Sequence, residues 1–463
     1  MLNLIRSLMP ASVALLLASE TLILFFCYVL ASALVIDVDL QFFLFEENGF
    51  FRISIVVASI LVGLYLQDLY TKIRARGKVL FIQQTSMVLG IAFLVQALMT
   101  YISRDLMLPR WLMIYGSIFV FMALPVWRFL YLKFAVNTVG TQRVLLVGTS
   151  SVIQELAERL LTNPEFGHNL LGYVAQSETP DQKIPNLPLL GELPDLRQIV
   201  ETHKPERILI GMTERRARMP VQELLDMRLG GIYVEEAAIA YEQAFGRVCT
   251  RELRPSQLIF STALGPSART EGIHTALSAV IAVIGTILTI PIMIIVAILV
   301  RLTSPGPILH GQIRSGLHGK PFTVYKFRSM KANAEATTGA VWAQKNDPRI
   351  TPIGKYLRKF RLDELPQFFN VLRGEMSMVG PRPERPEFVK TLSEKIPFYR
   401  QRLSVKPGLT GWAQISHKYG DTVEDTITKL EYDLYYIKHL SLALDVYILL
   451  STAKTVLLGR GAQ

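Results

Sequence analysis

The sequence predicts a membrane protein in three parts: a bundle of four transmembrane helices, a parallel α/β domain, and a second α/β domain carried on a re-entrant helical hairpin. Long apolar runs fill the first third of the 463 residues. Short aliphatic strands alternate with helical patterns in the middle, and a proline-interrupted apolar run precedes a basic, Gly- and Pro-rich last third. We therefore place the three domains at 1–138, 139–265 and 266–463, with the membrane hairpin at 275–302.

The transmembrane bundle is predicted from four nearly uncharged runs at 11–34, 53–69, 81–102 and 111–134. Each approaches the roughly 20 residues that a helix needs to cross a bilayer. The loop between the second and third runs carries Lys72, Arg74, Arg76 and Lys78. Because Lys and Arg gather in cytoplasmic loops, we expect the N-terminus and everything after about residue 140 on the cytoplasmic side of the membrane.

Strand-like runs at 143–148, 170–174, 207–212 and 232–236 alternate with helical patterns in the middle of the chain. This alternation is typical of a parallel, Rossmann-like sheet. The first strand-to-helix turn reads Gly148-Thr149-Ser150-Ser151, so it lacks the second and third glycines of a dinucleotide-binding turn. We therefore favour a structural, regulatory or oligomerisation role for this domain over nucleotide binding.

The hairpin is predicted from Thr275–Val300, a run of 26 residues without a charge that Pro291 interrupts. Proline removes a helix hydrogen bond, so a kink or break is expected there, and each half is too short to cross alone. From residue 305 onward, 24 Lys and Arg face 14 Asp and Glu. This charge favours a hairpin that dips into the inner leaflet and returns, with a kinked fifth span as the alternative.

Two adjacent acids, Asp363 and Glu364, stand out in the basic last third. Thr351-Pro352 predicts the start of a short basic helix. A structural interpretation makes Asp363 the N-cap of a second helix that Gly374 ends.

The surroundings of the two acids favour a functional interpretation. Residues 321–330 predict a strand with Lys326 and Arg328 on one face, and VGPRPERP at 379–386 fixes Arg382 between two prolines. Cations clustered beside a membrane segment suit phosphate groups, a lipid phosphate in particular.

Residues 303–415 resemble the catalytic domain of the bacterial sugar transferases, the monotopic phosphoglycosyl transferases that load polyprenyl phosphate. The matching stretches are TSPGP, QIRSG, GKPFTVYKFRSM, TPIGKYLRKFRLDELPQFFNVLRGEMSMVGPRPERPEF and VKPGLTGWAQI. The four spans and the α/β domain resemble the large, hexose-1-phosphate form of this family. Two departures are Ile290 before the hairpin proline, where many relatives have Ser, and His310-Gly311 in the turn after the hairpin.

The resemblance implies transfer of hexose 1-phosphate from a UDP-hexose to undecaprenyl phosphate, with release of UMP. It also implies that the protein lies in the bacterial inner membrane with its catalytic domain facing the cytoplasm. Asp363 would form a covalent phosphosugar intermediate, and Glu364 would bind metal or assist proton transfer. It implies Mg²⁺ held by Asp363 and Glu364, and the product would start an exopolysaccharide or a related glycan. The implied phosphate-binding residues are Arg382, Lys326, Arg328, Arg358 and Arg361.

A carboxylate nucleophile splits one transfer between two anions into two easier steps, and cations offset the phosphate charges. Two alternatives stay open: a polyprenyl-phosphate glycosyltransferase that releases UDP, and a membrane scaffold for polysaccharide assembly. A homodimer is compatible with the multi-domain form, and nothing in the sequence indicates a nucleic-acid partner. The sequence does not identify the hexose.

Overall fold

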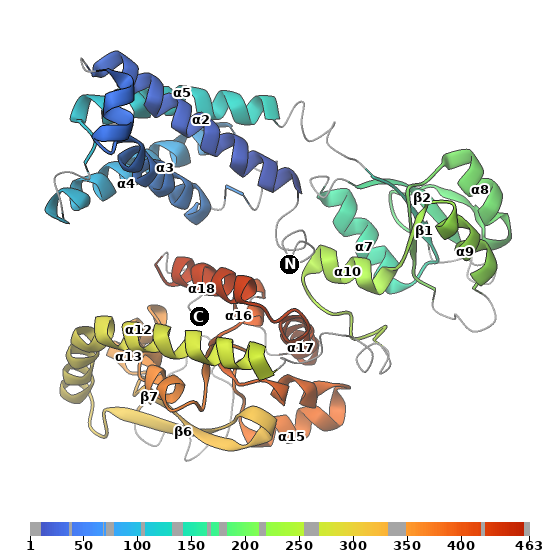
Figure 1. Ribbon diagram of the computed structural model, residues 1–463. Helices are drawn as coiled ribbons and strands as arrows, with labels where there is room; N and C mark the ends of the chain where they lie inside the picture. Colours follow the sequence, from blue (N-terminus) through green and yellow to red (C-terminus); the bar gives the residue numbers. More distant parts are fainter. Residues whose placement is uncertain are drawn as a thin grey trace. The chain divides into compact units, whose positions relative to one another are not determined.

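The computed structural model describes residues 11–36, 39–67, 69–70, 78–102, 107–131, 142–163, 168–175, 183–212, 219–253, 268–331, 349–417 and 422–457. The chain forms two compact units, Met1–Ala240 and Tyr241–Gln463. Figure 1 labels their helices and strands. The first unit holds a helical bundle and a parallel sheet, and the second holds the candidate active site.

The four apolar runs of the first unit form helices. They are α2 (Ala11–Val35), α3 (Gly49–Leu66), α4 (Lys78–Ile102) and α5 (Arg110–Leu130), with a short π-helix, η1 (Phe42–Glu46), before α3. Over the described residues, α2, α3 and α5 are long and apolar enough to cross a membrane. The described apolar stretch of α4 is shorter, Thr85–Ala97.

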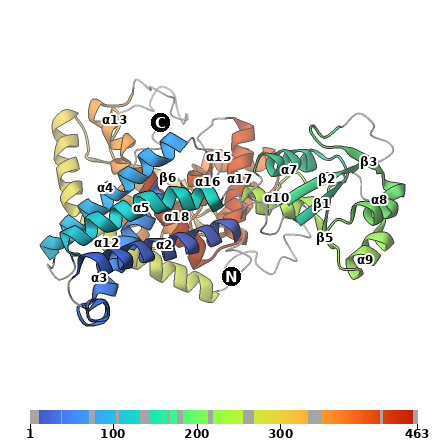
Figure 2. The same ribbon diagram turned by 90° about the horizontal axis from the view of Figure 1, so that it is seen from above.

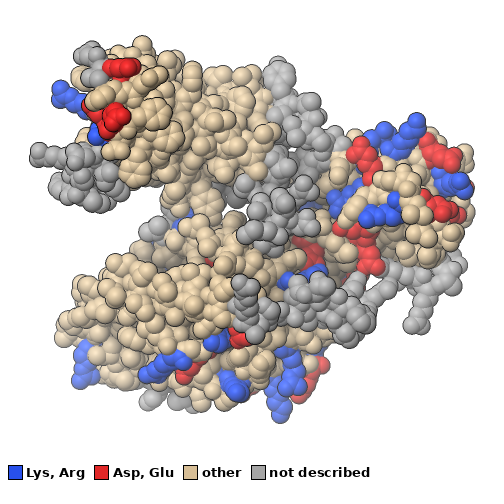
Figure 3. Space-filling view, viewed as in Figure 1, with Lys and Arg blue, Asp and Glu red and all other residues tan. Residues whose placement is uncertain are grey.

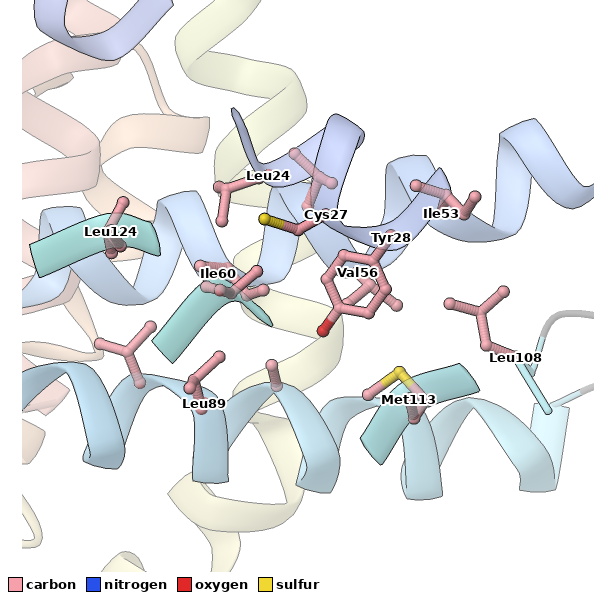
Figure 4. Close-up of a cluster of buried hydrophobic side chains, with 14 of the residues drawn as sticks. Leu24, Cys27, Tyr28, Ile53, Val56, Ile60, Leu89, Leu108, Met113 and Leu124 are labelled. Atoms are coloured by element: carbon pink, nitrogen blue, oxygen red, sulfur yellow. The ribbon is translucent and has the colours of Figure 1, made fainter. Parts of the chain in front are cut away.

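The core of the bundle is built from side chains of all four helices (Figure 4). Tyr28 is fully buried and its hydroxyl lies 3.0 Å from the Ser117 hydroxyl. A Cβ atom on Gly116 would lie 2.4 Å from the Tyr28 ring, so the glycine lets α5 approach α2 closely. Small residues at such contacts are typical of helices that pack in a membrane.

A buried ion pair also joins α2 to α5. Glu20 is fully buried and pairs with the Arg128 guanidinium, and the Tyr70 hydroxyl donates a 2.6 Å hydrogen bond to Glu20 Oε2. Arg128 Nη1 donates to the Leu69 carbonyl oxygen at 3.1 Å. Charges inside a bundle are expensive unless each is paired and hydrogen-bonded, and here both are.

The α/β part of the first unit is a five-stranded, all-parallel sheet of order β3-β2-β1-β4-β5. The strands are β1 (Gln142–Val147), β2 (His168–Ala175), β3 (Leu189–Glu192), β4 (Arg207–Ile210) and β5 (Tyr233–Glu236). The helices are α7 (Ser151–Thr162), η5 (Leu193–Asp195), α8 (Leu196–His203) and α9 (Val221–Leu229). Helix α7 covers one face, and α8 and α9 cover the other (Figure 2). The predicted parallel sheet is confirmed, and β3 is a strand that the sequence pattern missed.

The turn after β1 uses its glycine for packing within the sheet. Gly148 has φ +99°, and a Cβ atom there would lie 2.3 Å from the Gly211 carbonyl oxygen. The Ser150 hydroxyl caps α7 by accepting from the Ile153 amide at 3.4 Å. The backbone that approaches Gly148 closely is therefore the Gly211 carbonyl, which follows β4 directly.

The second unit begins within α10 (Ala237–Phe245), which follows β5 directly. Its first elements are α12 (Ala268–Thr303), β6 (Leu309–Ser315), η6 (Leu317–Gly319), β7 (Pro321–Phe327), α13 (Pro352–Lys359), η7 (Leu362–Glu364) and α14 (Gln367–Leu372). Next come β8 (Ser377–Val379), α15 (Pro386–Lys395), η8 (Tyr399–Ser404), β9 (Gly408–Thr410), α16 (Trp412–Ser416), α17 (Val423–Lys438) and α18 (Leu442–Leu457). Strands β6 and β7 form an antiparallel hairpin, and β8 and β9 a parallel pair.

Helix α12 contains the predicted proline-interrupted segment. It is one helix of 36 residues with Pro291 inside it, and its ribbon forms two arms that meet at a sharp bend (Figures 1 and 2). Sharp bends of this kind arise at proline, which removes one hydrogen bond of the helix ladder. Over Thr270–Thr303 the helix is long and apolar enough to cross a membrane.

The surface of the second unit is divided by chemistry. Figure 3 shows an almost uncharged face over α12 and a row of Lys, Arg, Asp and Glu toward β6 and α15. Ile287 and Leu288 of α12 are 64% and 70% exposed. Apolar exposure on this scale indicates a surface that lipid or another apolar phase covers.

Candidate active site

The Asp363–Glu364 pair lies on a tight 3₁₀ turn, η7, between two short helices. Helix α13 starts where Thr351 accepts a 3.0 Å hydrogen bond from the Gly354 amide, as the sequence predicts. Arg361 then adopts a left-handed conformation with φ +53°, which reverses the chain after α13. Leu362 and Leu365 flank the two acids and pack on the apolar cluster formed by α12, β7 and α13. The turn is therefore anchored by its leucines, and both acids are buried.

The prediction that Asp363 caps the second helix is wrong. Helix α14 begins at Gln367, with Pro366 in the N-cap position and no side-chain cap. Asp363 instead lies inside η7, where the Glu364 amide donates to the Arg361 carbonyl oxygen. The predicted end at Gly374 is confirmed: this residue has φ +76° directly after the last turn. A capping role therefore does not account for Asp363.

Glu364 is the centre of a cluster of cations. Its Oε1 atom accepts from Lys326 Nζ at 2.7 Å and from Arg382 Nη2 at 2.9 Å. Arg361 Nη1 lies 3.7 Å from its Oε2 atom. Burial alone would raise the pKa of Glu364, but these three cations outweigh it and hold the pKa well below its usual range. Glu364 is therefore ionised and orients the side chains of Lys326 and Arg382.

Asp363 has a different environment. Within the described part of the chain, its carboxylate accepts no hydrogen bond, and burial followed by the neighbouring Glu364 raises its pKa. Lys326, Arg358 and Arg382 act in the opposite direction. The adjacent acids thus have pKa values pushed apart by their surroundings, an arrangement that often marks the reactive groups of an active site.

Of the predicted phosphate-binding residues, Lys326, Arg358, Arg361 and Arg382 surround the two acids, whereas Arg328 does not. Arg328 lies just past the end of β7 and is buried. Its Nη2 atom donates to the Ser304 carbonyl oxygen at 2.6 Å and to the Val300 carbonyl oxygen at 3.3 Å. Its hydrogen bonds therefore tie β7 to the C-terminal end of α12, because a buried guanidinium takes the carbonyls that a helix end leaves free.

The loop that carries Arg382, residues 380–385, is called the Arg382 loop and is held by several elements. The Gly408 amide donates to the Pro381 carbonyl oxygen at 2.9 Å, and the Gly380 amide donates to the Thr410 carbonyl oxygen at 2.9 Å. On β6, Arg314 Nη1 donates to the Pro383 carbonyl oxygen at 3.1 Å. Glycines at 380 and 408 are needed here, since a Cβ atom on either would lie 2.5 Å or less from backbone atoms. The Pro- and Gly-rich sequence thus fixes the loop that positions Arg382.

Two positioning residues were not found by sequence reasoning. Arg402 is buried, pairs with Asp433 of α17 at 2.8 Å, and donates to the Arg382 carbonyl oxygen at 3.0 Å. Asn370 is fully buried; its Oδ1 atom accepts from the Tyr325 amide, and its Nδ2 atom donates to the Thr323 carbonyl oxygen. Asn370 therefore ties α14 to β7, the strand that carries Lys326. No short-range pattern marks either residue, because their partners are distant in the chain.

The two acids differ in how well they fit a divalent cation. Mg²⁺ is usually bound by one or two carboxylates together with substrate phosphates and water. In the described part of the chain, the Asp363 oxygens accept no hydrogen bond, so this residue fits a metal ligand. The Glu364 oxygens already face three cations, so Glu364 fits poorly in this arrangement. Among the described residues, no three His, Cys, Asp or Glu side chains gather into a metal site.

Comparison with known proteins identifies the family. The chain is 34% identical over 339 residues to a UDP-glucose:undecaprenyl-phosphate glucose-1-phosphate transferase of Xanthomonas campestris pv. campestris, covering 69% of this chain and 67% of that protein. The chain belongs to the bacterial sugar transferase family. The profile described as bacterial sugar transferase matches residues 269–459 of the chain, and one described as CoA-binding domain matches 65–225.

Further relatives match over less than half of the chain. A UDP-N-acetylgalactosamine-undecaprenyl-phosphate N-acetylgalactosaminephosphotransferase of Aeromonas hydrophila is 46% identical over 222 residues, 48% of this chain and 52% of that protein. A UDP-glucose:undecaprenyl-phosphate glucose-1-phosphate transferase of Escherichia coli K12 is 45% identical over 175 residues, 37% of this chain and 38% of that protein. The chain thus spans about half the length of the Aeromonas relative and about two thirds of the Xanthomonas one.

The CoA-binding description does not fit the turn after β1. In a pyrophosphate-binding G-x-G-x-x-G turn that starts at Gly148, the second and third glycines would stand where this chain has Ser150 and Ile153. The open side of Gly148 faces the Gly211 carbonyl oxygen, and the Ser150 hydroxyl is engaged in capping α7. These contacts agree with the sequence-based preference against nucleotide binding at this turn.

Proposed function

We propose that this protein transfers a sugar 1-phosphate from a UDP-sugar to undecaprenyl phosphate and releases UMP. The observation that carries the proposal is the pair of Asp363, whose carboxylate accepts no hydrogen bond in the described chain, and Glu364, which holds Lys326 and Arg382 beside it. Positive groups fixed next to an available carboxylate suit attack on a phosphate that carries negative charge. The names of the relatives supply the substrate class.

In the first step, an oxygen of Asp363 attacks the β-phosphorus of the UDP-sugar. The bond between that phosphorus and the bridging oxygen breaks, UMP leaves with the electron pair, and an aspartyl phosphosugar remains. In the second step, a phosphate oxygen of undecaprenyl phosphate attacks the same phosphorus and expels the Asp363 carboxylate. The product is an undecaprenyl diphosphate sugar, and Asp363 is restored.

The residues around Asp363 have separate parts in this scheme. Arg382 and Lys326 would hold the donor phosphates, while Arg358 would help to keep Asp363 ionised. Arg361, which lies beside the Oε2 atom of Glu364, would help to keep Glu364 ionised. Mg²⁺, when bound, would neutralise phosphate charge, with Asp363 as the protein ligand that fits best.

The reaction is tested by incubating the purified protein in lipid with a panel of UDP-sugars and undecaprenyl phosphate. The panel includes UDP-glucose and UDP-N-acetylgalactosamine, which the names of the relatives suggest. Release of UMP supports the proposal, whereas release of UDP supports a glycosyltransferase. Binding of assembly partners without turnover of any UDP-sugar supports a scaffold.

The nucleophile is tested with Asp363→Asn, which keeps the shape of the side chain and removes the charge. We expect lipid-linked product to fall by at least about 10³-fold, as for loss of a covalent nucleophile. Glu424→Gln, on the exposed start of α17, is the matched control for a lost carboxylate. Product formation by Asp363→Asn near the wild-type rate would reject the assignment.

We also propose that α12 enters the inner leaflet and returns, leaving the active site in the cytoplasm. The bent helix and the net positive charge after residue 305 support this topology. The two native cysteines are buried, so a cysteine introduced at the exposed position Lys320 can be labelled selectively. A membrane-impermeant maleimide should label Lys320→Cys only after cells are permeabilised; labelling of intact spheroplasts would favour a fully spanning α12.

A further inference from the structure

We propose that residues Tyr241–Thr250, the docking segment, position the Arg382 loop and thereby set the affinity for the UDP-sugar. The inference rests on the proposed function. This segment lies outside both regions matched by the family profiles, 65–225 and 269–459. It belongs to the second unit, where hydrogen bonds join it to two elements that hold Arg382.

The first connection runs through Trp412. The Gly246 carbonyl oxygen accepts a 2.6 Å hydrogen bond from Trp412 Nε1, and a Cβ atom on Gly246 would lie 3.0 Å from the same ring. Trp412 follows Gly411 directly, and a Cβ atom on Gly411 would lie 2.3 Å from the Gly380 carbonyl oxygen. Trp412 is therefore attached to the point where β9 meets the start of the Arg382 loop.

The second connection runs through α17. Glu431 Oε1 accepts from the Thr250 amide at 3.1 Å and from the Thr250 hydroxyl at 2.8 Å. The Val248 amide donates to the Glu431 carbonyl oxygen at 3.1 Å. Two residues further along the same helix, Asp433 pairs with Arg402, which donates to the Arg382 carbonyl oxygen.

A third set of contacts fixes the C-terminal end of α17. Glu242 accepts from Lys438 Nζ at 2.7 Å, and the His439 ring lies 2.6 Å from its other oxygen. The docking segment thus holds α17 near both Glu431 and its C-terminal end. Both α17 and Trp412 are connected by contacts to the loop that carries Arg382. Displacing the docking segment should therefore move the Arg382 guanidinium, which would bind the donor phosphates.

Two substitutions test this link from within the segment. Gly246→Ala adds a methyl group against Trp412 at a residue with φ +64°. Its matched control is Gly231→Ala, where φ is +96° and no atom lies within 4 Å of the added Cβ. Thr250→Val removes the hydroxyl that binds Glu431. Its control is Thr428→Val, whose hydroxyl binds its own helix at the Glu424 carbonyl oxygen and, within the described part of the chain, no other element.

Steady-state UMP release is measured in lipid with UDP-glucose and with UDP-N-acetylgalactosamine. We expect Gly246→Ala and Thr250→Val to raise KM for the UDP-sugar about fivefold, the loss of about one neutral hydrogen bond, with kcat within about twofold. Both controls should retain the wild-type KM. In an Arg382→Lys background the two substitutions should have little further effect on KM, because coupled residues are not additive.

The outcomes separate the inference from the function on which it rests. Absence of UMP release by the wild-type protein counts against the proposed function. With an active wild-type protein, an unchanged KM in Thr250→Val and Gly246→Ala overturns the inference. So does an increase in KM that persists fully in the Arg382→Lys background, because the segment would then act by another route. Thr250→Val alone decides the matter if Gly246→Ala does not fold.

Discussion

Arg402 donates a 3.0 Å hydrogen bond from its Nη2 atom to the backbone carbonyl oxygen of Arg382. One buried guanidinium thus holds the main chain of another arginine, whose own side chain contacts Glu364. Asp433 keeps Arg402 in place and compensates its charge. Some residues of the active site therefore contact Glu364 directly, and others hold those residues in place. Substitutions of the two kinds should have different effects.

Arg402→Met should destabilise the protein, because it leaves the Asp433 carboxylate buried without a partner. We expect a loss of about 3–5 kcal/mol in the free energy of unfolding, measured by denaturation in detergent. The double variant Arg402→Met with Asp433→Leu should recover most of this stability. Its KM for the UDP-sugar should nevertheless be raised, as in the single variant, because the Arg382 carbonyl oxygen still lacks its hydrogen bond from Arg402. A single variant as stable as the wild type would contradict this account.

Arg382→Lys should reduce kcat/KM about 10- to 100-fold. A lysine keeps the charge but loses the planar fork that can bind Glu364 and a phosphate together. Arg385→Lys makes the same chemical change three residues further along the loop and should stay within about threefold of wild type. If the two variants lose activity equally, the effect belongs to the loop in general and not to Arg382.

The pH dependence of kcat/KM should show an acidic limb set by Asp363. As a nucleophile, Asp363 must be ionised, and burial beside Glu364 raises its pKa above the ordinary value. Activity should therefore rise with pH through this raised pKa. Lys326→Met removes a cation that lowers the pKa of Asp363, so the acidic limb should move to higher pH. A limb that stays in place would exclude Asp363 as the titrating group.

Asn370→Leu should destabilise the second unit by about 2–4 kcal/mol. The substitution leaves the Tyr325 amide and the Thr323 carbonyl oxygen without their side-chain partner in the interior. Asn163→Leu removes a half-buried asparagine whose side chain, among the described residues, bonds to its own helix, and it should change stability by less than about 0.5 kcal/mol. Thermal unfolding of both variants, followed by circular dichroism, measures the difference.

Arg128→Met should weaken the helical bundle, because Glu20 would remain fully buried without its cation. The expected cost is about 3–5 kcal/mol. It should appear as a lower temperature at which the detergent-solubilised protein aggregates on heating. Arg110→Met, at the exposed start of α5, is the control and should leave that temperature unchanged. Equal losses in both variants would show that the ion pair adds no specific stability.

Much of the local structure could be predicted from the sequence. The long uncharged runs predicted helices α2 to α5, because only a helix satisfies the backbone of an apolar segment of that length. The alternation of strands and helices predicted the parallel sheet, and Thr351-Pro352 predicted the start of α13. Asp363, Glu364, Lys326 and Arg382 were selected together, since prolines, glycines and charges at short spacing mark a built loop.

The tertiary structure decided which of these residues meet. Arg328 shares a strand face with Lys326 in the sequence pattern, yet it binds the end of α12, because β7 ends before it. Asp363 was expected as a helix cap, but the left-handed Arg361 moved it into a buried turn. Arg402, Asp433, Asn370 and the docking segment act over 20 to 197 residues of separation. Local patterns determine helices and turns, whereas only the folded chain brings distant polar groups within hydrogen-bonding distance.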